Sequence, residues 1–308
     1  MEMTDFLKSC LAFASVLVLA PLLSGIVNKL KAYFTGRQGA PVLQPYYELF
    51  RVIKKETINS SHSSFISRIS PPVNLACTVI ASAMVPLASA KPLISFEGDI
   101  IFFAYVLGLS RFFQIIAAMD IGSSFEGMGA SRESFFSIFA EPIFFFTAGA
   151  LAFISGNTSL YKIFSSVNAS GAVYFVFVIV SSISFFVLAV AECSRMPVDD
   201  PNTHLELTMI HEVMILDNSG ADLFMYQYSA QIKLFIYMAF EAAFLLPLLK
   251  ISGMGAVLIV VLTAVIFAFV LAVVETITGR IKIREVPQYL LFATAIGILN
   301  LLIFVLNK

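Results

Sequence analysis

The chain has 308 residues, of which 59% are hydrophobic and only 13% charged, with a net charge of −1 and a mean hydropathy of +0.90. Apolar runs of about 20 residues recur along it, which predicts an all-α polytopic membrane protein and excludes a soluble domain of useful size. The charge balance indicates no nucleic-acid partner. Three cysteines without a Cys-x-x-Cys spacing exclude a disulfide framework and indicate no metal site.

About eight transmembrane helices are expected, near 6–27, 73–91, 99–119, 134–155, 171–192, 229–249, 254–276 and 287–306. They make residues 1–308 a single transmembrane domain. The N-terminal segment carries one lysine and two acids and shows no small-residue cleavage site, which favours a retained span over a signal peptide. Lysines and arginines gather in the loops after odd-numbered spans, so these loops are predicted to be cytoplasmic and both termini to lie outside.

The first of these loops, 28–70, contains a patterned segment from Gln44 to Glu56. Leu43, Tyr46, Tyr47, Phe50 and Ile53 fall on one helical arc, while Glu48, Arg51 and Lys55 fall on another. This pattern predicts a short amphipathic helix in the membrane interface plane, or equally a surface helix that only packs on its neighbours.

Ionisable side chains inside the apolar spans are the candidates for function. Arg111 and Gln114 share one face of the third span, and Glu133, Ser137 and Glu141 line a stripe of the fourth. Lys233, Tyr237 and Glu241 form another stripe in the sixth. Such groups need partners, so they predict either a polar path for ion coupling or structural ion pairs that fix helix packing. Lys233 and Glu241 could form an internal counter-ion pair, whereas Glu192 and Glu275 lie near span ends and could simply snorkel.

The segment 191–220 breaks the apolar pattern with a dense set of charged residues. It holds Glu192, Arg195, Asp199, Asp200, His204, Glu206, His211, Glu212 and Asp217. Such a cluster at the mouth of a span predicts contact with protein partners or a wet cavity. Two histidines seven residues apart lack the further ligands that a metal site needs, so hydrogen bonding or proton buffering is the preferred interpretation.

Three blocks of sequence, in order, resemble one known family. They are RQGAPVLQPYYELFRVIKKE, SRFFQIIAAMDIGSSFEGMGASRESFFSIFAEP and AECSRMPVDDP. The chain resembles the membrane subunit shared by respiratory complex I, where it is NADH dehydrogenase subunit 1, and the group 4 membrane-bound nickel–iron hydrogenases, including formate hydrogenlyase subunit 4. The resemblance runs from Gly36 to about Arg284. It places Arg111, Asp120, Arg132, Glu133, Glu141, Glu192, Arg195, Asp199 and Pro201 on family positions.

The resemblance implies a subunit without a redox centre of its own, in a prokaryotic cytoplasmic membrane. Such a subunit anchors a hydrogenase-like large subunit and a small iron–sulfur subunit, whose nickel–iron centre and clusters do the redox chemistry, and couples them to antiporter-like membrane subunits. The loops 28–70 and 193–228 are then the docking face, with Arg37, Gln44, Glu48, Arg51, Arg195, Asp200, His204, His211, Glu212 and Asp217. The expected proton or sodium coupling residues are Arg111, Glu141, Glu192, Asp199, Glu206, Lys233 and Glu275.

Departures from the complex I branch favour the hydrogenase branch. Where complex I continues with a glutamate-rich run, this sequence has Asn202 and His204 and then an apparent insertion, LTMIHEVMILDNSG. Two alternatives stay open at this point. One is the quinone-site subunit of a complex I-type NADH dehydrogenase, and the other is a stand-alone secondary ion transporter, for which internal repeats are expected.

Overall fold

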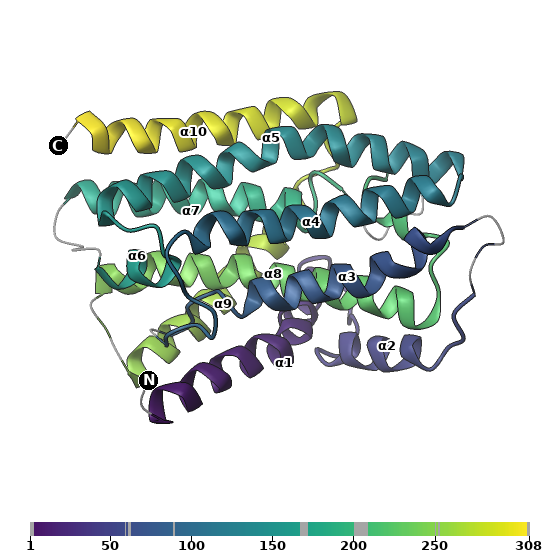
Figure 1. Ribbon diagram of the computed structural model, residues 1–308, viewed down its shortest axis with the longest axis horizontal. Helices are drawn as coiled ribbons and strands as arrows, with labels where there is room; N and C mark the ends of the chain where they lie inside the picture. The colour runs from purple at the N-terminus through teal and green to yellow at the C-terminus, as the bar shows by residue number, and fades with distance from the viewer. Residues whose placement is uncertain are drawn as a thin grey trace.

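The structure is a computed structural model that describes residues 3–58, 60, 63–88, 90–166, 172–199, 209–249, 251 and 253–306. Its regular elements are helical within those ranges (Figure 1). They are α1 (Met3–Phe34), α2 (Gln44–Ile53), α3 (Phe65–Ser82), α4 (Asp99–Asp120), α5 (Ser124–Ser155), α6 (Leu160–Ser166), α7 (Ala172–Glu192), η1 (Glu212–Ile215), α8 (Gly220–Leu249), α9 (Met254–Ile277), η2 (Ile283–Glu285) and α10 (Val286–Leu306).

Seven of the described helices are long and apolar enough to cross a membrane, namely α1, α4, α5, α7, α8, α9 and α10. The all-α polytopic architecture expected from the sequence is confirmed. The span expected at 73–91 corresponds to α3, which begins at Phe65 and ends at Ser82. Arg68, Pro71 and Pro72 make this helix less apolar than the seven, yet it runs alongside α4 (Figure 1). Both chain termini lie at the same end of the bundle.

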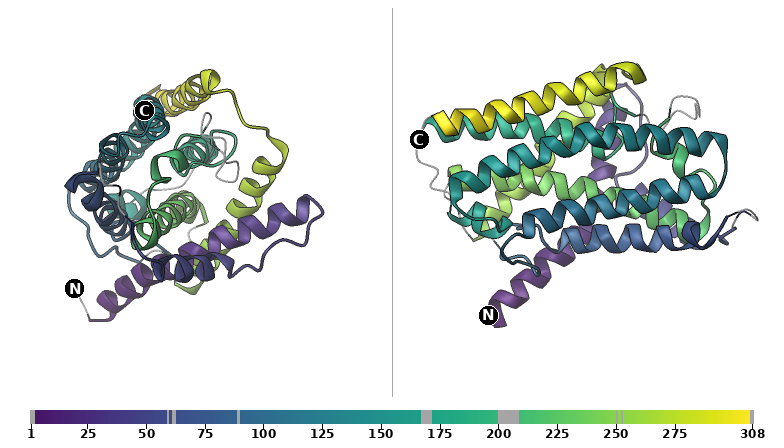
Figure 2. Two further views of the ribbon diagram at one scale, coloured as in Figure 1. Left: turned by 90° about the vertical axis from the view of Figure 1, so that its right-hand side faces the viewer. Right: turned by 45° about the horizontal axis from the view of Figure 1, so that its top comes forward.

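The helices form a ring around two central ones. Seen end-on in Figure 2, α7 and α8 occupy the middle, and α1, α3, α4, α5, α9 and α10 surround them. The same two helices are the most buried of the seven candidate spans. Polar side chains on α7 and α8 are therefore removed from lipid by the surrounding helices, which makes the centre of the bundle the place where ionisable groups can be held.

Pro21 interrupts the hydrogen-bond ladder of α1 inside its span. Proline has no N–H, so the carbonyl of Leu17 loses its usual helical donor. The hydroxyl of Tyr228, on α8, donates to that carbonyl at 2.9 Å, and the hydroxyl of Tyr46, on α2, donates to the carbonyl of Val18. The neighbouring helix α8 thus satisfies the carbonyl that the proline leaves open, and the bond from α2 adds a second contact to the same turn.

Two glycines allow close backbone approach at the end of the bundle that carries the long loops. A Cβ at Gly25 of α1 would lie 1.9 Å from the carbonyl oxygen of Val42, just before α2. A Cβ at Gly129 of α5 would lie 2.3 Å from Val213 and 2.8 Å from the carbonyl oxygen of Ile210. Glycine at these positions therefore lets α2 and the segment around η1 pack directly on the bundle.

The amphipathic helix of the first loop is α2, which packs one apolar face on the protein and exposes a second. Pro45, Leu49 and Val52 are the buried residues of this helix, and they pack on the protein. Tyr47, Phe50 and Ile53 from the arc are exposed instead. The interpretation as a helix that only packs on its neighbours leaves this outward apolar surface unexplained, whereas an interfacial position accounts for it.

Candidate functional site

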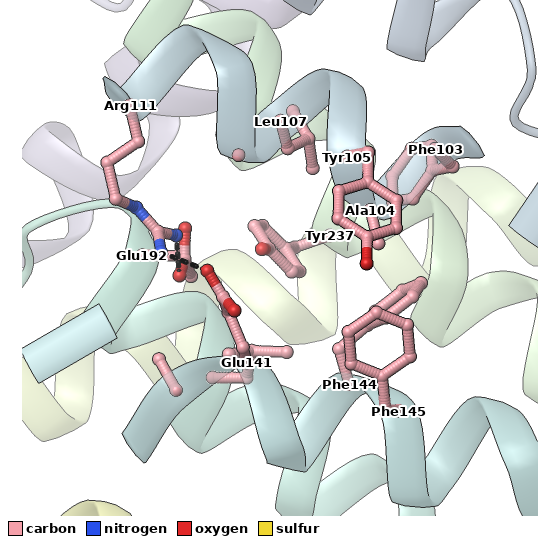
Figure 3. A pocket seen from close by; sticks show the side chains of 13 residues that line it. Phe103, Ala104, Tyr105, Leu107, Arg111, Glu141, Phe144, Phe145, Glu192 and Tyr237 are labelled. Carbon is pink, nitrogen blue, oxygen red and sulfur yellow. Dashed lines mark hydrogen bonds and ion pairs between the residues drawn. The ribbon is translucent and has the colours of Figure 1, made fainter. Parts of the chain in front are cut away.

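Arg111 lies at the centre of the candidate site, buried in the middle of α4. Its guanidinium contacts three carboxylates from two other helices, and Figure 3 shows two of them, Glu141 and Glu192. Nη2 donates to Glu192 of α7, Nε lies 3.3 Å from Glu133, and Nη1 lies 3.5 Å from Glu141, both on α5. A guanidinium has five donors and stays charged, so this arrangement supplies the acceptors that it needs inside a membrane span.

A second cation completes the cluster from the central helix α8. Nζ of Lys233 lies 2.6 Å from Oε2 of Glu192, so that this carboxylate bridges Lys233 and Arg111. Lys233 thus pairs with Glu192 and not with Glu241, whose buried Oε1 has no hydrogen-bond partner. We call Arg111, Glu133, Glu141, Glu192 and Lys233 the central cluster; with every member ionised, it carries a formal charge of −1.

The three carboxylates of the central cluster differ sharply in exposure. The side chain of Glu192 is 6% exposed and that of Glu133 is 17% exposed, but that of Glu141 is 57% exposed. Glu133 and Glu141 lie on one stripe of α5, eight residues apart, so their shared contact with Arg111 follows from helical spacing. Glu141 therefore belongs to the cluster and to the outer surface of the bundle at once.

Asp199 lies in a separate, structural arrangement just after α7. Its carboxylate accepts the N–H groups of Ile210 and His211 at 3.1 and 3.0 Å, and Arg280 donates to it at 3.0 Å. The chain reaches it through a helix end in which Ser194 has φ of +51° and the N–H of Arg195 donates to the carbonyl of Val190. This pattern is a Schellman-type C-cap, here without the usual glycine. Asp199 ties the 209–217 segment to the end of α9.

Glu275 forms a further ion-pair group with residues of two other segments. Its carboxylate lies 2.6 Å from Nζ of Lys31 on α1 and 3.5 Å from Nη1 of Arg195. The side chain of Glu275 is only 1% exposed, so it does not snorkel to solvent. The structure gives Glu275 no contact with the central cluster. Its ion-pair group is linked to that cluster through the chain, because Arg195, which contacts Glu275, follows Glu192 by three residues.

Three adjoining cavities lead from the loop end of the bundle to the central cluster. The end cavity lies between α1, α2 and α8 and is lined by Glu48, Arg195, Glu212 and Gln231, among others. The central cavity contains Lys233, Asn74 and Glu133. The two share Cys193 and His211 as lining residues. The lateral cavity, between α4 and α5, shares Arg111 and Glu192 with the central cavity and is drawn in Figure 3.

His211 lies between the end and central cavities, with Nε2 3.3 Å from the side-chain nitrogen of Gln114. Burial, together with the positive charge of Lys233, lowers the pKa of His211 to about 4. Burial raises the pKa of the neighbouring Glu212 to about 7, and the charge of Asp199 adds to this. Both side chains are therefore held toward their neutral forms, as expected for groups withdrawn from water.

The other residues predicted for docking are spread over the loop end. Arg37, Gln44, Glu48 and Arg51 are on or beside α2, where Gln44 donates to Glu48 at 3.1 Å. Asp217 donates its N–H to the buried Glu126. Asp200, His204 and Glu206 lie outside the described residues. The functional assignments of all these residues stay predictions.

Sequence reasoning missed Lys31, Glu126 and Arg280 as members of buried polar groups. Lys31 and Arg280 occur just beyond apolar runs, where the sequence indicates only a positive loop, and their partners are far away in the chain. Glu126 had a better signal, because it follows Gly122 and Ser123 at the start of a helix. Within the described ranges, no group of three or more His, Cys, Asp or Glu side chains could hold a metal ion.

The sequence profile of the family described as NADH dehydrogenase matches residues 7–305. Hydrogenase-4 component C of Escherichia coli (strain K12) is 27% identical over 288 residues, which cover 91% of this chain and 90% of that protein. Formate hydrogenlyase subunit 4 of the same organism is 29% identical over 148 residues, 48% of each chain.

The chain also resembles subunits of other respiratory complexes at lower identity. A subunit of the NADH-quinone oxidoreductase of Methylococcus capsulatus is 25% identical over 46% of this chain and 44% of that protein. A chain in the structure of the membrane-bound sulfane sulfur reductase, described as an archaeal respiratory membrane complex, shares the fold. It has a TM-score of 0.80 and 20% identity, covering 96% of this chain and 99% of that one. Because the family profile matches nearly the whole sequence, the chain belongs to the NADH dehydrogenase family.

Proposed function

We propose that the chain is the membrane subunit of a hydrogenase-like complex, in which it docks a soluble redox arm and couples its chemistry to proton or sodium translocation. The similarity to Hydrogenase-4 component C carries the proposal, because it extends over about nine tenths of both proteins. The relatives named as parts of quinone oxidoreductases match over 46%, 54% and 62% of this chain, at 24–25% identity. The hydrogenase branch is therefore favoured over the complex I branch.

The partners in this proposal are a hydrogenase-like large subunit, a small iron–sulfur subunit and antiporter-like membrane subunits. The nickel–iron centre and the iron–sulfur clusters would belong to the soluble partners. Docking would take place at the loop end, where α2, the end of α7 and the 209–217 segment come together. The end cavity lies there and shares Cys193 and His211 with the central cavity, whose lining includes Lys233 and Glu192.

Coupling would depend on Glu192, the carboxylate that bridges the two cations of the central cluster. Charges held at a few ångströms in a low-dielectric site titrate as a coupled set, so one added or removed charge changes the protonation of all. A redox-linked charge at the docking face would act through the end and central cavities, with His211 between them, on Glu192 and its partners. The lateral cavity would then pass the change toward neighbouring membrane subunits.

A quinone site is the competing function for the end cavity. Its wall includes Glu48, Arg195, Glu212 and Gln231, and burying an apolar quinone ring and tail against such groups would leave them without water. This polarity favours a hydrated cavity. Inhibition of the electron transfer of the complex by quinone-site inhibitors would support the quinone alternative instead.

The test is a gentle purification of the tagged chain from native membranes, with the co-purified proteins identified by mass spectrometry and hydrogen-dependent dye reduction measured on the same sample. Recovery of a nickel–iron large-subunit homologue with hydrogen activity would support the proposal. Recovery of the chain alone, with ion flux in liposomes, would support a stand-alone transporter.

The coupling step is tested with Glu192→Gln in membrane vesicles. We expect hydrogen-dependent dye reduction to persist while ion uptake per electron falls at least tenfold. Glu97→Gln is the matched control, because Glu97 is exposed and pairs with the exposed Lys162 at the opposite end of the bundle. Ion uptake that is unchanged in the Glu192→Gln vesicles would refute the coupling role.

A further inference from the structure

Glu141 is placed where a bilayer alone would not stabilise it. It lies within about one turn of the midpoint of α5, a helix that crosses the membrane. Its side chain is 57% exposed on the outside of the bundle. Every residue of α4 and α5 lies within the part of the chain that the structure describes. Of the charged residues of these two helices, Glu141 is the one that is exposed. An exposed carboxylate at this depth costs several kcal/mol in contact with lipid tails.

The surface around this carboxylate is otherwise apolar. Tyr105 and Leu109 of α4 and Ile138 and Phe145 of α5 are exposed on the same two helices. Such side chains suit lipid or a packed helix equally well and select neither. The charge therefore decides what can cover this surface, and it excludes lipid tails as the sole covering.

The cation already in contact with Glu141 does not neutralise it fully. Arg111 lies 3.5 Å away, but its closer contacts are with Glu192 and Glu133. Lys233 reaches only Glu192. With two cations and three carboxylates, the central cluster has a formal charge of −1. Glu141 is the carboxylate of the cluster that is exposed on the outer surface of the bundle. One more cation would balance the cluster.

The lateral cavity is built to receive such a cation from outside. Figure 3 shows the Glu141 carboxylate between the guanidinium of Arg111 and the aromatic rings of Tyr105 and Phe145. Small residues on the facing helices, Gly108 and Ala140, leave the space open. A Cβ added at Gly108 would meet nothing within 4 Å. Mostly apolar walls, with Glu141 and Glu192 beside Arg111 at the base, suit a lysine, whose methylene stem packs on apolar surface while its ammonium reaches a carboxylate.

We propose that the surface formed by α4 and α5 is the docking site of a transmembrane helix from another subunit, which inserts a lysine into the lateral cavity to pair with Glu141. This inference rests on the proposed function only in that the chain works within a membrane complex. It does not depend on hydrogen, quinone or any other acceptor. The added cation balances the central cluster and connects it directly to the neighbouring subunit.

The test uses the native complex in membranes and a membrane-soluble carbodiimide. The reagent activates a carboxyl group, an adjacent lysine amine attacks it, an amide bond forms and the urea leaves. Without an adjacent amine, the activated carboxyl rearranges to a stable N-acylurea. We expect mass spectrometry to find Glu141 joined to a lysine within a membrane span of a co-purified subunit, and the cross-link to be absent from Glu141→Gln. An N-acylurea on Glu141 without a cross-link, or no reaction there, would overturn the proposal.

Charge reversal gives an independent measurement. Glu141→Lys should reduce recovery of the cross-linked subunit at least tenfold, and changing that subunit's lysine to glutamate should restore it. Val265→Lys is the control for the cost of a lysine at mid-span, because Val265 is exposed in the middle of α9. Gly108→Leu should fill the cavity and reduce recovery without changing charge. A complex that lacks hydrogen activity but shows the cross-link would refute the proposed function and leave this docking site in place.

Discussion

Removing Lys233 should destabilise the protein strongly, and removing Glu192 at the same time should restore part of the loss. The two groups lie 2.6 Å apart with side chains 15% and 6% exposed. Coulomb attraction at that distance is about 6 kcal/mol with an effective dielectric constant of 20, and desolvation offsets much of it. Breaking such a buried pair from one side costs about 3–5 kcal/mol when the remaining charge is uncompensated, and the cost is smaller here because Arg111 still contacts Glu192.

The charges of the central cluster give the direction of each change. Lys233→Met leaves one cation with three carboxylates, a formal charge of −2. Adding Glu192→Gln returns the charge to −1, the value of the unaltered cluster. We therefore expect the double variant to be more stable than Lys233→Met alone, with a coupling of about 2 kcal/mol or more.

The assay is equilibrium unfolding of the purified chain in mixed micelles titrated with dodecyl sulfate, followed by tyrosine fluorescence. Wild type, both single variants and the double variant form a double-mutant cycle. Lys162→Met is the control, because Lys162 pairs with Glu97 on the surface and its loss should cost less than about 1 kcal/mol. Additive effects of Lys233→Met and Glu192→Gln would refute the shared-carboxylate geometry.

Three further predictions concern the loop end. Gly129→Ala should destabilise the chain by about 1–3 kcal/mol and increase hydrogen exchange in 209–217, because its Cβ would meet backbone there, whereas Gly127→Ala, with open space, should be neutral or stabilising. Ser194→Gly should stabilise by up to about 1 kcal/mol in the same unfolding titration, because φ is positive there, and Ser194→Val should destabilise. His211 has a folded-state pKa of about 4 against 6.5, so its contribution to stability is lost as pH falls between these values; Glu212, at about 7 against 4.5, loses its contribution as pH rises. The two effects oppose each other. As pH falls from 7 to 4, the free energy of unfolding of His211→Gln should therefore rise and that of Glu212→Gln should fall, each by up to about 3 kcal/mol. The same change of unfolding free energy with pH in both variants would contradict both pKa shifts.

The sequence was sufficient for the fold class and for most span positions, because long apolar runs admit few structures in a membrane. It failed at α3, where Arg68 and two prolines lower the hydropathy. The predicted span was therefore placed too late in the chain, toward the more apolar residues after Ser82. It did not assign the inner face of α2. Leu49 and Val52 pack inward there, because contacts with α1 and α8, which the local pattern does not reveal, decide which face is buried.

For the candidate site, the sequence identified most residues of the central cluster but not the pairing of Lys233 with Glu192. Helical spacing indicated that Glu133 and Glu141 share a face, and this is how both reach Arg111. The bond between Lys233 and Glu192 joins α8 to α7, and the alternative of a Lys233–Glu241 pair had equal support from spacing. Which carboxylate faces outward depends on how α4 and α5 are rotated in the bundle, and that is decided by packing among all the helices.

The proline in α1 also bears on the order in which the chain can assemble. During synthesis α1 emerges long before residue 228, yet the carbonyl of Leu17 depends on the Tyr228 hydroxyl for its hydrogen bond. Until α8 arrives, that carbonyl would lack a partner in lipid, at a cost of several kcal/mol. We therefore expect α1 to remain in contact with the hydrated insertion machinery until α8 has been made. Although it is made before α8, α1 would then lose contact with the insertion machinery only after α8 has been made.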